Sequence, residues 1–180
     1  MSPSDFVKKY LPFAKQTETK SGISGVAILA QAALESGWGE HAPGNMFFGV
    51  KDFDGVNGNE QLLTTFEYSK RSDLTPQQIG LVTIAKIEPT TIKGTKFFKY
   101  TGTAYFRKYN TPEESFTEHT NVFFKTKLPD GSLRYAAALA VKGDPIKFVQ
   151  AIAAAGYAQS PNYADQLVSL VGTIQKYVTT

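Results

Sequence analysis

Glu35 stands at the end of an apolar segment, in the run Leu29-Ala30-Gln31-Ala32-Ala33-Leu34-Glu35-Ser36-Gly37-Trp38-Gly39. Residues 24–36 are apolar almost all round, which predicts a buried central helix. Burial raises the pKa of a carboxyl group because the charged form loses hydration. A carboxylic acid that is still protonated near neutral pH can protonate the leaving oxygen of a glycosidic bond. The alternative interpretation is a solvated Glu35 at a helix end, with Trp38 as a core ring.

Two further glutamates, Glu113 and Glu114, follow the pair Thr111-Pro112. With Thr111 as the N-cap, Glu114 is the third helical residue, where a glutamate reaches back to complete a capping box. We therefore expect a structural role for both glutamates, with catalysis as the alternative. His119 lies on the same predicted helix and is expected to be a surface or packing residue.

Composition excludes several classes of protein. The chain has 180 residues, enough for one domain with a small added lobe. Its formal charge of +3 comes from scattered lysines without the basic stripe of a nucleic-acid-binding protein. It has no cysteine and only two histidines, so we expect no metal site and no cofactor. No window is apolar enough for a membrane span, and the N-terminus has no signal-peptide pattern.

An N-cap residue before a proline predicts the start of a helix at five places. The middle of the chain is rich in β-branched and aromatic residues, which predicts strands. The expected starts are Ser2-Pro3, Thr75-Pro76, Thr111-Pro112, Asp144-Pro145 and Ser160-Pro161. The expected short antiparallel strands are 62–68, 82–87, 96–100 and 104–108. The sequence thus predicts a helical protein with a β-lobe at about residues 60–108. Aromatic residues reach 13%, which suggests a ring-lined cleft, and the natural place for it is between the two parts.

Several motifs in order along the chain resemble those of the bacterial N-acetylglucosaminidases of glycoside hydrolase family 73. This family of peptidoglycan hydrolases includes the hydrolase domain of the flagellar rod-cap protein, autolysins and phage lysins. The similar blocks are Ala30-Gln31-Ala32-Ala33-Leu34-Glu35-Ser36-Gly37-Trp38-Gly39, Asn45-Met46-Phe47-Phe48-Gly49-Val50-Lys51, Thr64-Thr65-Phe66-Glu67-Tyr68, Phe106-Arg107-Lys108-Tyr109 with Glu113-Glu114-Ser115, and Ala155-Gly156-Tyr157-Ala158 with Pro161-Asn162-Tyr163-Ala164. The resemblance covers nearly the whole chain, which implies a single glucosaminidase domain over 1–180 with a lysozyme-like α+β fold.

The resemblance also implies roles for individual residues. Glu35 matches the catalytic general acid, Glu67 the second acidic residue in the β-lobe, and Tyr157 a tyrosine that assists near the acid. The positions that line or support the sugar groove are Trp38, Asn45, Phe48 and Tyr163.

This chain departs from the family pattern at three places. A pair of asparagines is replaced by Asn45-Met46, and a Tyr-Ala-Thr-Asp run by Tyr157-Ala158-Gln159-Ser160, which lacks the acid. The third departure is an additional segment at about 69–95, whose role stays open. Because of this segment, Glu60 and Glu88 are local rivals of Glu67.

The expected activity is hydrolysis of the β-1,4 bond after N-acetylglucosamine in peptidoglycan glycan strands, at the cell wall. A second carboxylate about 6.5–9.5 Å from Glu35, or the substrate's own acetamido group, would assist. The alternatives are a lytic transglycosylase or muramidase on the same strands, and a non-catalytic wall-binding or structural module. The setting is periplasmic, extracellular or phage-delivered, within a larger cell-wall, flagellar, phage or secretion assembly. The sequence leaves the organism and the oligomeric state open.

Overall fold

Side-chain caps begin four helices in the computed structural model of the chain, which describes residues 1–53, 57–158, 160 and 162–178. The capped helices are α1 (Pro3–Ser21), α3 (Pro76–Ile79), α4 (Pro112–Lys125) and α6 (Pro145–Ala154). In each, the N-cap side chain accepts a hydrogen bond from the backbone N–H three residues on, which satisfies one of the donors that a helix start leaves open. The four predicted starts are confirmed, and the fifth falls partly on Pro161, outside the described residues.

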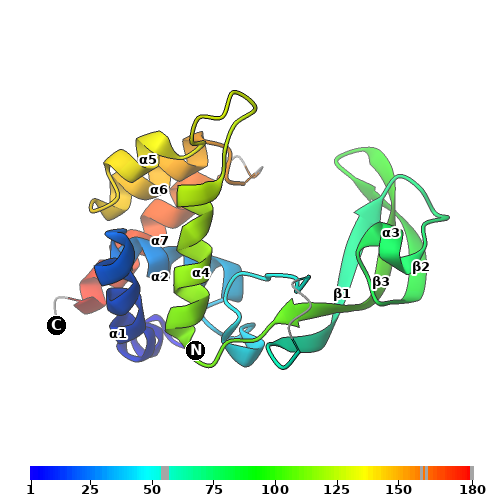
Figure 1. Cartoon of the computed structure of the whole chain (residues 1–180), viewed down its shortest axis with the longest axis horizontal. Helices are drawn as coiled ribbons and strands as arrows, with labels where there is room; N and C mark the ends of the chain where they lie inside the picture. Colours follow the sequence, from blue (N-terminus) through cyan, green and yellow to red (C-terminus); the bar gives the residue numbers. More distant parts are fainter. Residues whose placement is uncertain (54–56, 159, 161, 179–180) are drawn as a thin grey trace. The chain divides into compact units, whose positions relative to one another are not determined.

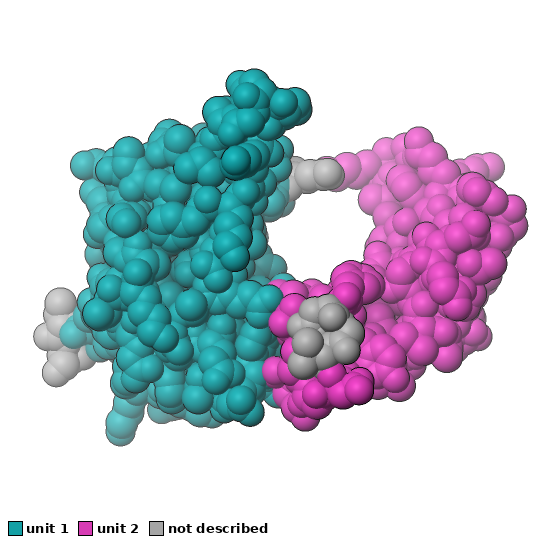
Figure 2. Space-filling view, viewed as in Figure 1, with its two compact units in different colours: residues 1–48, 109–180 teal, residues 49–108 magenta. Residues whose placement is uncertain are grey.

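The chain divides into two compact units, which Figure 2 distinguishes by colour. Unit 1 comprises residues 1–48 and 109–180, and unit 2 comprises residues 49–108. Unit 1 is helical, and its central helix is the apolar α2 (Gly25–Ser36), which contacts α1, α4, α6 and α7 (Tyr163–Val178) (Figure 1). The shorter elements of unit 1 are the 3₁₀ turn η1 (Pro43–Asn45) and α5 (Ala136–Ala140). Helix α5 is shorter than the predicted 133–141.

The core of unit 1 is built around α2 and a set of aromatic rings. Residues 25–33 of α2 are all buried, as its apolar sequence predicted. Phe47 is the junction of the rings, because its centroid lies 5.0 Å from that of Tyr10 on α1 and 5.0 Å from that of Phe116 on α4. Phe47 thereby fixes the loop after α2 against α1 and α4, and its neighbours Met46 and Phe48 are positioned with it.

Unit 2 is a three-stranded antiparallel sheet with strand order β1-β3-β2. Its strands are β1 (Glu60–Ser69), β2 (Thr83–Ile92) and β3 (Thr95–Arg107). The prediction of separate strands at 96–100 and 104–108 was wrong, because β3 runs through both. Gly102 lies between the two predicted ranges, and a Cβ on it would lie 1.9 Å from the carbonyl oxygen of Thr83. The glycine is therefore required for the close approach of β2.

The part of the additional segment that precedes β2, residues 70–82, packs on one face of this sheet. Tyr100 on β3 is fully buried, and its hydroxyl donates to the carbonyl of Arg71 (2.8 Å) and accepts from the N–H of Leu74 (3.2 Å). Leu81, at the end of the segment, is also buried, and its Cδ1 lies 3.1 Å from the position of a Cβ on Gly102. The segment thus supplies the unit with a small core of its own.

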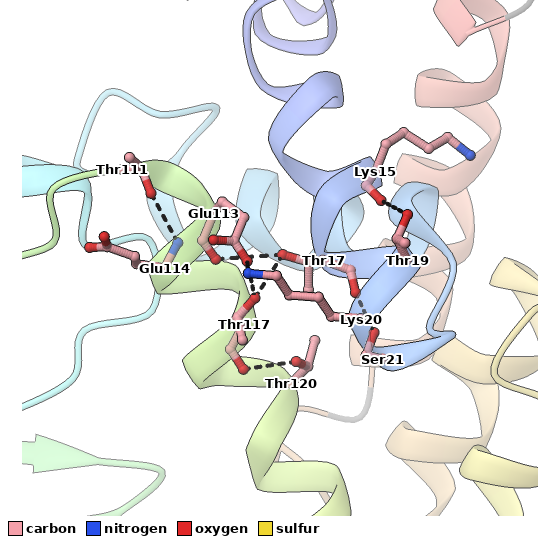
Figure 3. A network of polar contacts seen from close by, with 10 residues as sticks. All are labelled: Lys15, Thr17, Thr19, Lys20, Ser21, Thr111, Glu113, Glu114, Thr117 and Thr120. Atoms are coloured by element: carbon pink, nitrogen blue, oxygen red, sulfur yellow. Dashed lines mark hydrogen bonds and ion pairs between the residues drawn. The ribbon is translucent and has the colours of Figure 1, made fainter.

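Glu113 joins α4 to α1 within unit 1 (Figure 3). Its carboxylate accepts from Lys20 Nζ at 2.9 Å and from the Thr117 hydroxyl, which also contacts Thr17 on α1. Burial acts to raise the pKa of Glu113, but the hydrogen bonds from Thr117 and Lys20 outweigh it and leave the pKa below its usual value. Glu114 accepts from the N–H of Asn110 at 2.8 Å instead of that of the N-cap residue, so the predicted capping box is displaced by one residue. Both glutamates have structural contacts, as expected.

Candidate active site

The turn after α2 presents Glu35 at the end of a rigid, buried helix. Gly37, Trp38 and Gly39 have φ angles of 58°, 57° and 78°, a left-handed run that glycine adopts easily and that tryptophan rarely does. The Trp38 ring meets Phe6 edge-on at a centroid distance of 5.4 Å, and this packing holds the unusual backbone. Glycine is favoured at position 39 by its φ angle of 78°, and a Cβ there would also lie only 3.3 Å from the Tyr10 ring.

Glu35 has an exposed surface, yet its pKa is raised because surrounding protein displaces part of the water that would solvate the charge. Among the residues that the structure describes, none makes a hydrogen bond or ion pair with its carboxyl group. This carboxyl is therefore accessible to a ligand and holds its proton to higher pH than a fully solvated glutamate does. The beginning of α7 lies nearby, where an open cavity of about 620 Å³ is lined by Leu34, Asn162, Asp165, Gln166, Ser169 and Leu170.

Two tyrosines lie within electrostatic reach of Glu35. The rings of Tyr157 and Tyr163 stack with centroids 5.6 Å apart and an interplanar angle of 20°. The pKa of Tyr157 is raised by burial first, then by Tyr163 and by the charge of Glu35. Burial also raises the pKa of Tyr163; a hydrogen bond from Gln31 opposes this shift, and the charge of Glu35 adds to it. Both phenols therefore stay protonated and can donate hydrogen bonds throughout the physiological range.

A row of rings continues from Tyr157 into the core. The Tyr157 hydroxyl lies 3.5 Å from His119 Nε2, and the His119 ring stacks on Phe48 at 3.6 Å with an interplanar angle of 8°. Burial lowers the pKa of His119 to about 3, so the imidazole is neutral at neutral pH. Of its two expected roles, surface or packing, His119 has the packing role. It holds Phe48 and Tyr157 in one wall.

Asn45 has a mainly structural environment. Its φ angle is 58°, and its side-chain nitrogen donates to the carbonyls of Tyr109 (3.0 Å) and Asn110 (3.3 Å). These bonds tie η1 to the segment before α4. The predicted role of Asn45 in lining or supporting the sugar groove stays a prediction. The sugar contacts of Trp38, Phe48 and Tyr163 likewise stay predictions.

Glu67 lies on β1 in unit 2, where its carboxylate is paired with Lys51 Nζ. Lys51 also donates to the carbonyl of Gly80 at 2.9 Å, so the ammonium group connects the strand to the covering segment. The rivals have local partners: Glu60 accepts from the N–H of Gly58 at 2.6 Å, and Glu88 pairs with Lys86 at 2.7 Å. The predicted role of Glu67 in catalysis stays a prediction.

Two residues of this site were missed by the sequence analysis as parts of it. Gln31 is 1% exposed, and its Nε2 donates to the Tyr163 hydroxyl at 3.5 Å. The sequence did contain an indication of this role, because Gln31 is the one polar residue among the apolar residues 25–34. His119 follows Phe116 by three residues and precedes Phe123 by four, a spacing that predicts the buried face of α4.

Chemically, this part of unit 1 offers a carboxyl group with a raised pKa beside neutral aromatic groups. The pKa of Glu35 is raised by burial, and Tyr157, Tyr163 and His119 are neutral. Such surroundings suit a ligand with many hydroxyl groups and an acid-labile bond. The described residues contain no group of three or more acidic or histidine side chains that could hold a metal ion. None of the described helices is long and apolar enough to cross a membrane.

Comparison with known proteins gives consistent matches. Residues 11–176 match the family model for glucosaminidase, described as mannosyl-glycoprotein endo-beta-N-acetylglucosaminidase. The peptidoglycan hydrolase FlgJ of Vibrio parahaemolyticus is 29% identical over 180 residues, which are 97% of this chain and 48% of that protein. The chain thus spans about half the length of this curated relative.

Solved structures agree with this match. The glycoside hydrolase domain of Salmonella typhimurium FlgJ is 25% identical with a TM-score of 0.66, over 99% of this chain and 92% of that one. The catalytic domain of the autolysin Auto from Listeria monocytogenes shares the fold, with a TM-score of 0.69 and 22% identity over 99% of this chain and 87% of that one. The predicted lysozyme-like α+β fold is confirmed.

Proposed function

We propose that this chain, which belongs to the glucosaminidase family, is a peptidoglycan hydrolase that cleaves the β-1,4 bond after N-acetylglucosamine in glycan strands. The relatives named as peptidoglycan hydrolases support this substrate. The cell wall is accordingly the place where we expect the chain to act. The observation that carries the proposal is Glu35, an accessible carboxyl with a raised pKa beside two neutral tyrosines.

In the proposed reaction, Glu35 donates its proton to the glycosidic oxygen as the bond from that oxygen to the anomeric carbon breaks. Proton transfer from a positioned acid contributes roughly 10²–10⁴-fold to such a rate. The position of Glu35 in the last turn of α2 fixes the carboxyl through a helix that is buried on most sides. The Tyr157 hydroxyl is a neutral donor within electrostatic reach of it and would orient the carboxyl, the water or the acetamido group.

The second half of the reaction needs a group that assists the attack on the anomeric carbon. Glu67 is our candidate, and the ion pair with Lys51 holds its carboxylate at a defined place in unit 2. The substrate's acetamido oxygen is the alternative, as in other hexosaminidases. In both routes one water is consumed and the new reducing end is N-acetylglucosamine.

The test is digestion of purified sacculi by the wild-type chain and by Glu35→Gln, which keeps the size of the side chain but removes the acidic proton. We expect at least a hundredfold lower rate of release of soluble fragments from the variant. Activity above about a tenth of wild type in a correctly folded Glu35→Gln protein would contradict the role of Glu35.

A further inference from the structure

One face of the unit 2 sheet exposes four large apolar side chains. They are Leu62 (52% exposed), Phe66 (50%), Tyr68 (42%) and Tyr105 (45%). The three on β1 alternate with inward residues, and Leu62 pairs with Tyr105 across the ladder, so all four share one face. We name this set the aromatic face. Glu67 lies between Phe66 and Tyr68 on the same strand and therefore points to the opposite face.

The aromatic face consists of two apolar pairs on one line. The rings of Phe66 and Tyr68 meet edge-on with centroids 5.5 Å apart. Leu62 and Tyr105 are paired across the ladder, and the pair Thr64–Thr103 lies between the two apolar pairs. Leu62 and Tyr68 are six residues apart on β1, which corresponds to roughly 20 Å along a strand, a length that suits an extended ligand. Exposed apolar side chains that gather on one face in this way often mark an interaction site.

The surroundings of the aromatic face are polar and basic. Threonines alternate with the rings, since Thr64 pairs with Thr103, and Phe66 pairs with Thr101. Lys99 Nζ lies 4.4 Å from the centre of the Phe66 ring, which keeps a positive charge beside the aromatic face. Residues 49–108 contain nine Lys and Arg and six Asp and Glu, so unit 2 carries the whole formal charge of +3. Lys99 therefore favours an occupant that carries some negative charge, and the threonines favour one with hydroxyl groups.

We infer that the aromatic face is a second, non-catalytic binding surface for the peptidoglycan glycan strand, an inference that rests on the proposed function. Pyranose rings present C–H groups that pack against the electron-rich faces of aromatic rings. Their hydroxyl groups suit the threonines, and the carboxylates of muramic acid and of the stem peptides suit Lys99. A purely apolar partner would take Lys99 and Thr64 out of water without replacing their hydrogen bonds to water.

The test is binding of the full chain to purified sacculi in a pelleting assay, with Glu35→Gln present in every protein so that nothing is cut. The test variant is Phe66→Thr with Tyr105→Thr, because threonine keeps the strand propensity. The matched control is Ile87→Thr, which removes a 39% exposed side chain from the opposite face of the same sheet. We expect roughly tenfold weaker binding for the test variant, on the order of two lost aromatic contacts, and no change for the control.

A single Lys99→Gln variant provides an independent measurement. It should weaken binding at low ionic strength, with the difference shrinking as salt screens the charges. Equal binding by the Phe66 and Tyr105 double variant and its parent would overturn the inference. So would sedimentation showing that the parent is a dimer that the double variant converts to a monomer, because the face would then be an interface between two copies.

The inference and the proposed function fail in different ways. If the double variant loses sacculus binding and the wild-type chain cuts no glycan, the binding surface is supported and the proposed hydrolase activity is rejected. If the wild type cleaves glycan and the double variant binds sacculi as its parent does, the proposed activity is supported and the binding surface is rejected.

Discussion

Replacement of His119 by phenylalanine should remove a specific dependence of stability on pH. Phenylalanine preserves the stack on Phe48 but cannot bind a proton. In the unfolded chain the imidazole binds a proton near pH 6.5, whereas in the folded chain it does so only at about pH 3. Between these pH values the unfolded state binds one proton more than the folded state at His119. The free energy of unfolding therefore rises with pH, and the contribution of His119 to stability decreases as pH falls.

The size of the effect follows from the two pKa values. Each unit of pH within the window changes the free energy of unfolding by about 1.36 kcal/mol. Between pH 7.5 and pH 5 the wild type should lose about 2 kcal/mol through His119, an order-of-magnitude figure that the variant should not lose. The carboxylates and His41 are present in both proteins, so their contributions cancel in the difference.

The assay is urea unfolding of both proteins at several pH values, followed by tryptophan fluorescence. Trp38 is the only tryptophan, and it packs on Phe6 in the same unit as His119, so it reports the relevant transition. As pH falls from 7.5 to 5, the wild type should lose about 2 kcal/mol more of its free energy of unfolding than the variant does. Parallel curves, within about 0.5 kcal/mol, would refute the reasoning that the buried imidazole stays neutral.

Three further predictions concern activity and the sheet. Tyr157→Phe should lower turnover by about tenfold, because it removes the hydroxyl group that we expect to assist the reaction. The melting temperature should change little, since the ring packing is kept and the 3.5 Å contact with His119 is weak. Wild-type turnover in this variant would show that Tyr157 has a structural role only. Gly102→Ala should destabilise unit 2 by several kcal/mol, since the added Cβ meets the Thr83 carbonyl at 1.9 Å; an unchanged circular dichroism melt would contradict this contact. Glu67→Gln should reduce hydrolysis less than Glu35→Gln does, because the acetamido route remains; normal activity in Glu67→Gln with loss in Glu60→Gln or Glu88→Gln would show that the assignment in the β-lobe was wrong.

The parts of the fold that local chemistry determines were predictable from the sequence. Thr111 and Asp144 accept from the N–H groups at the third helical positions, as an N-cap before proline requires. The helix that carries Glu35 was predictable because nearly all its residues are apolar. The division of β3 into two strands around Gly102 was wrong. Glycine can end a strand, but it can also permit a close approach between two strands, and only the position of Thr83 distinguishes these cases.

The site itself depends on contacts that the sequence does not show. His119 and Tyr157 are 38 residues apart, and their contact follows from how α4 packs on the segment after α6. The partner of Glu67 is Lys51, 16 residues away and outside its strand, so no local pattern predicted the pair. The spacing of His119 from Phe116 and Phe123 indicates that it is buried, but the sequence does not show that no charged partner accompanies it and that burial therefore keeps the imidazole neutral.

Mass spectrometry of the fragments released from purified sacculi tests the central claim most directly. The wild-type chain should produce fragments that end in reducing N-acetylglucosamine and have gained one water for each bond cut. The Glu35→Gln protein, with an unchanged melting temperature, should produce almost none. Fragments that end in anhydro-N-acetylmuramic acid or in reducing N-acetylmuramic acid, or equal release by Glu35→Gln, would contradict the account.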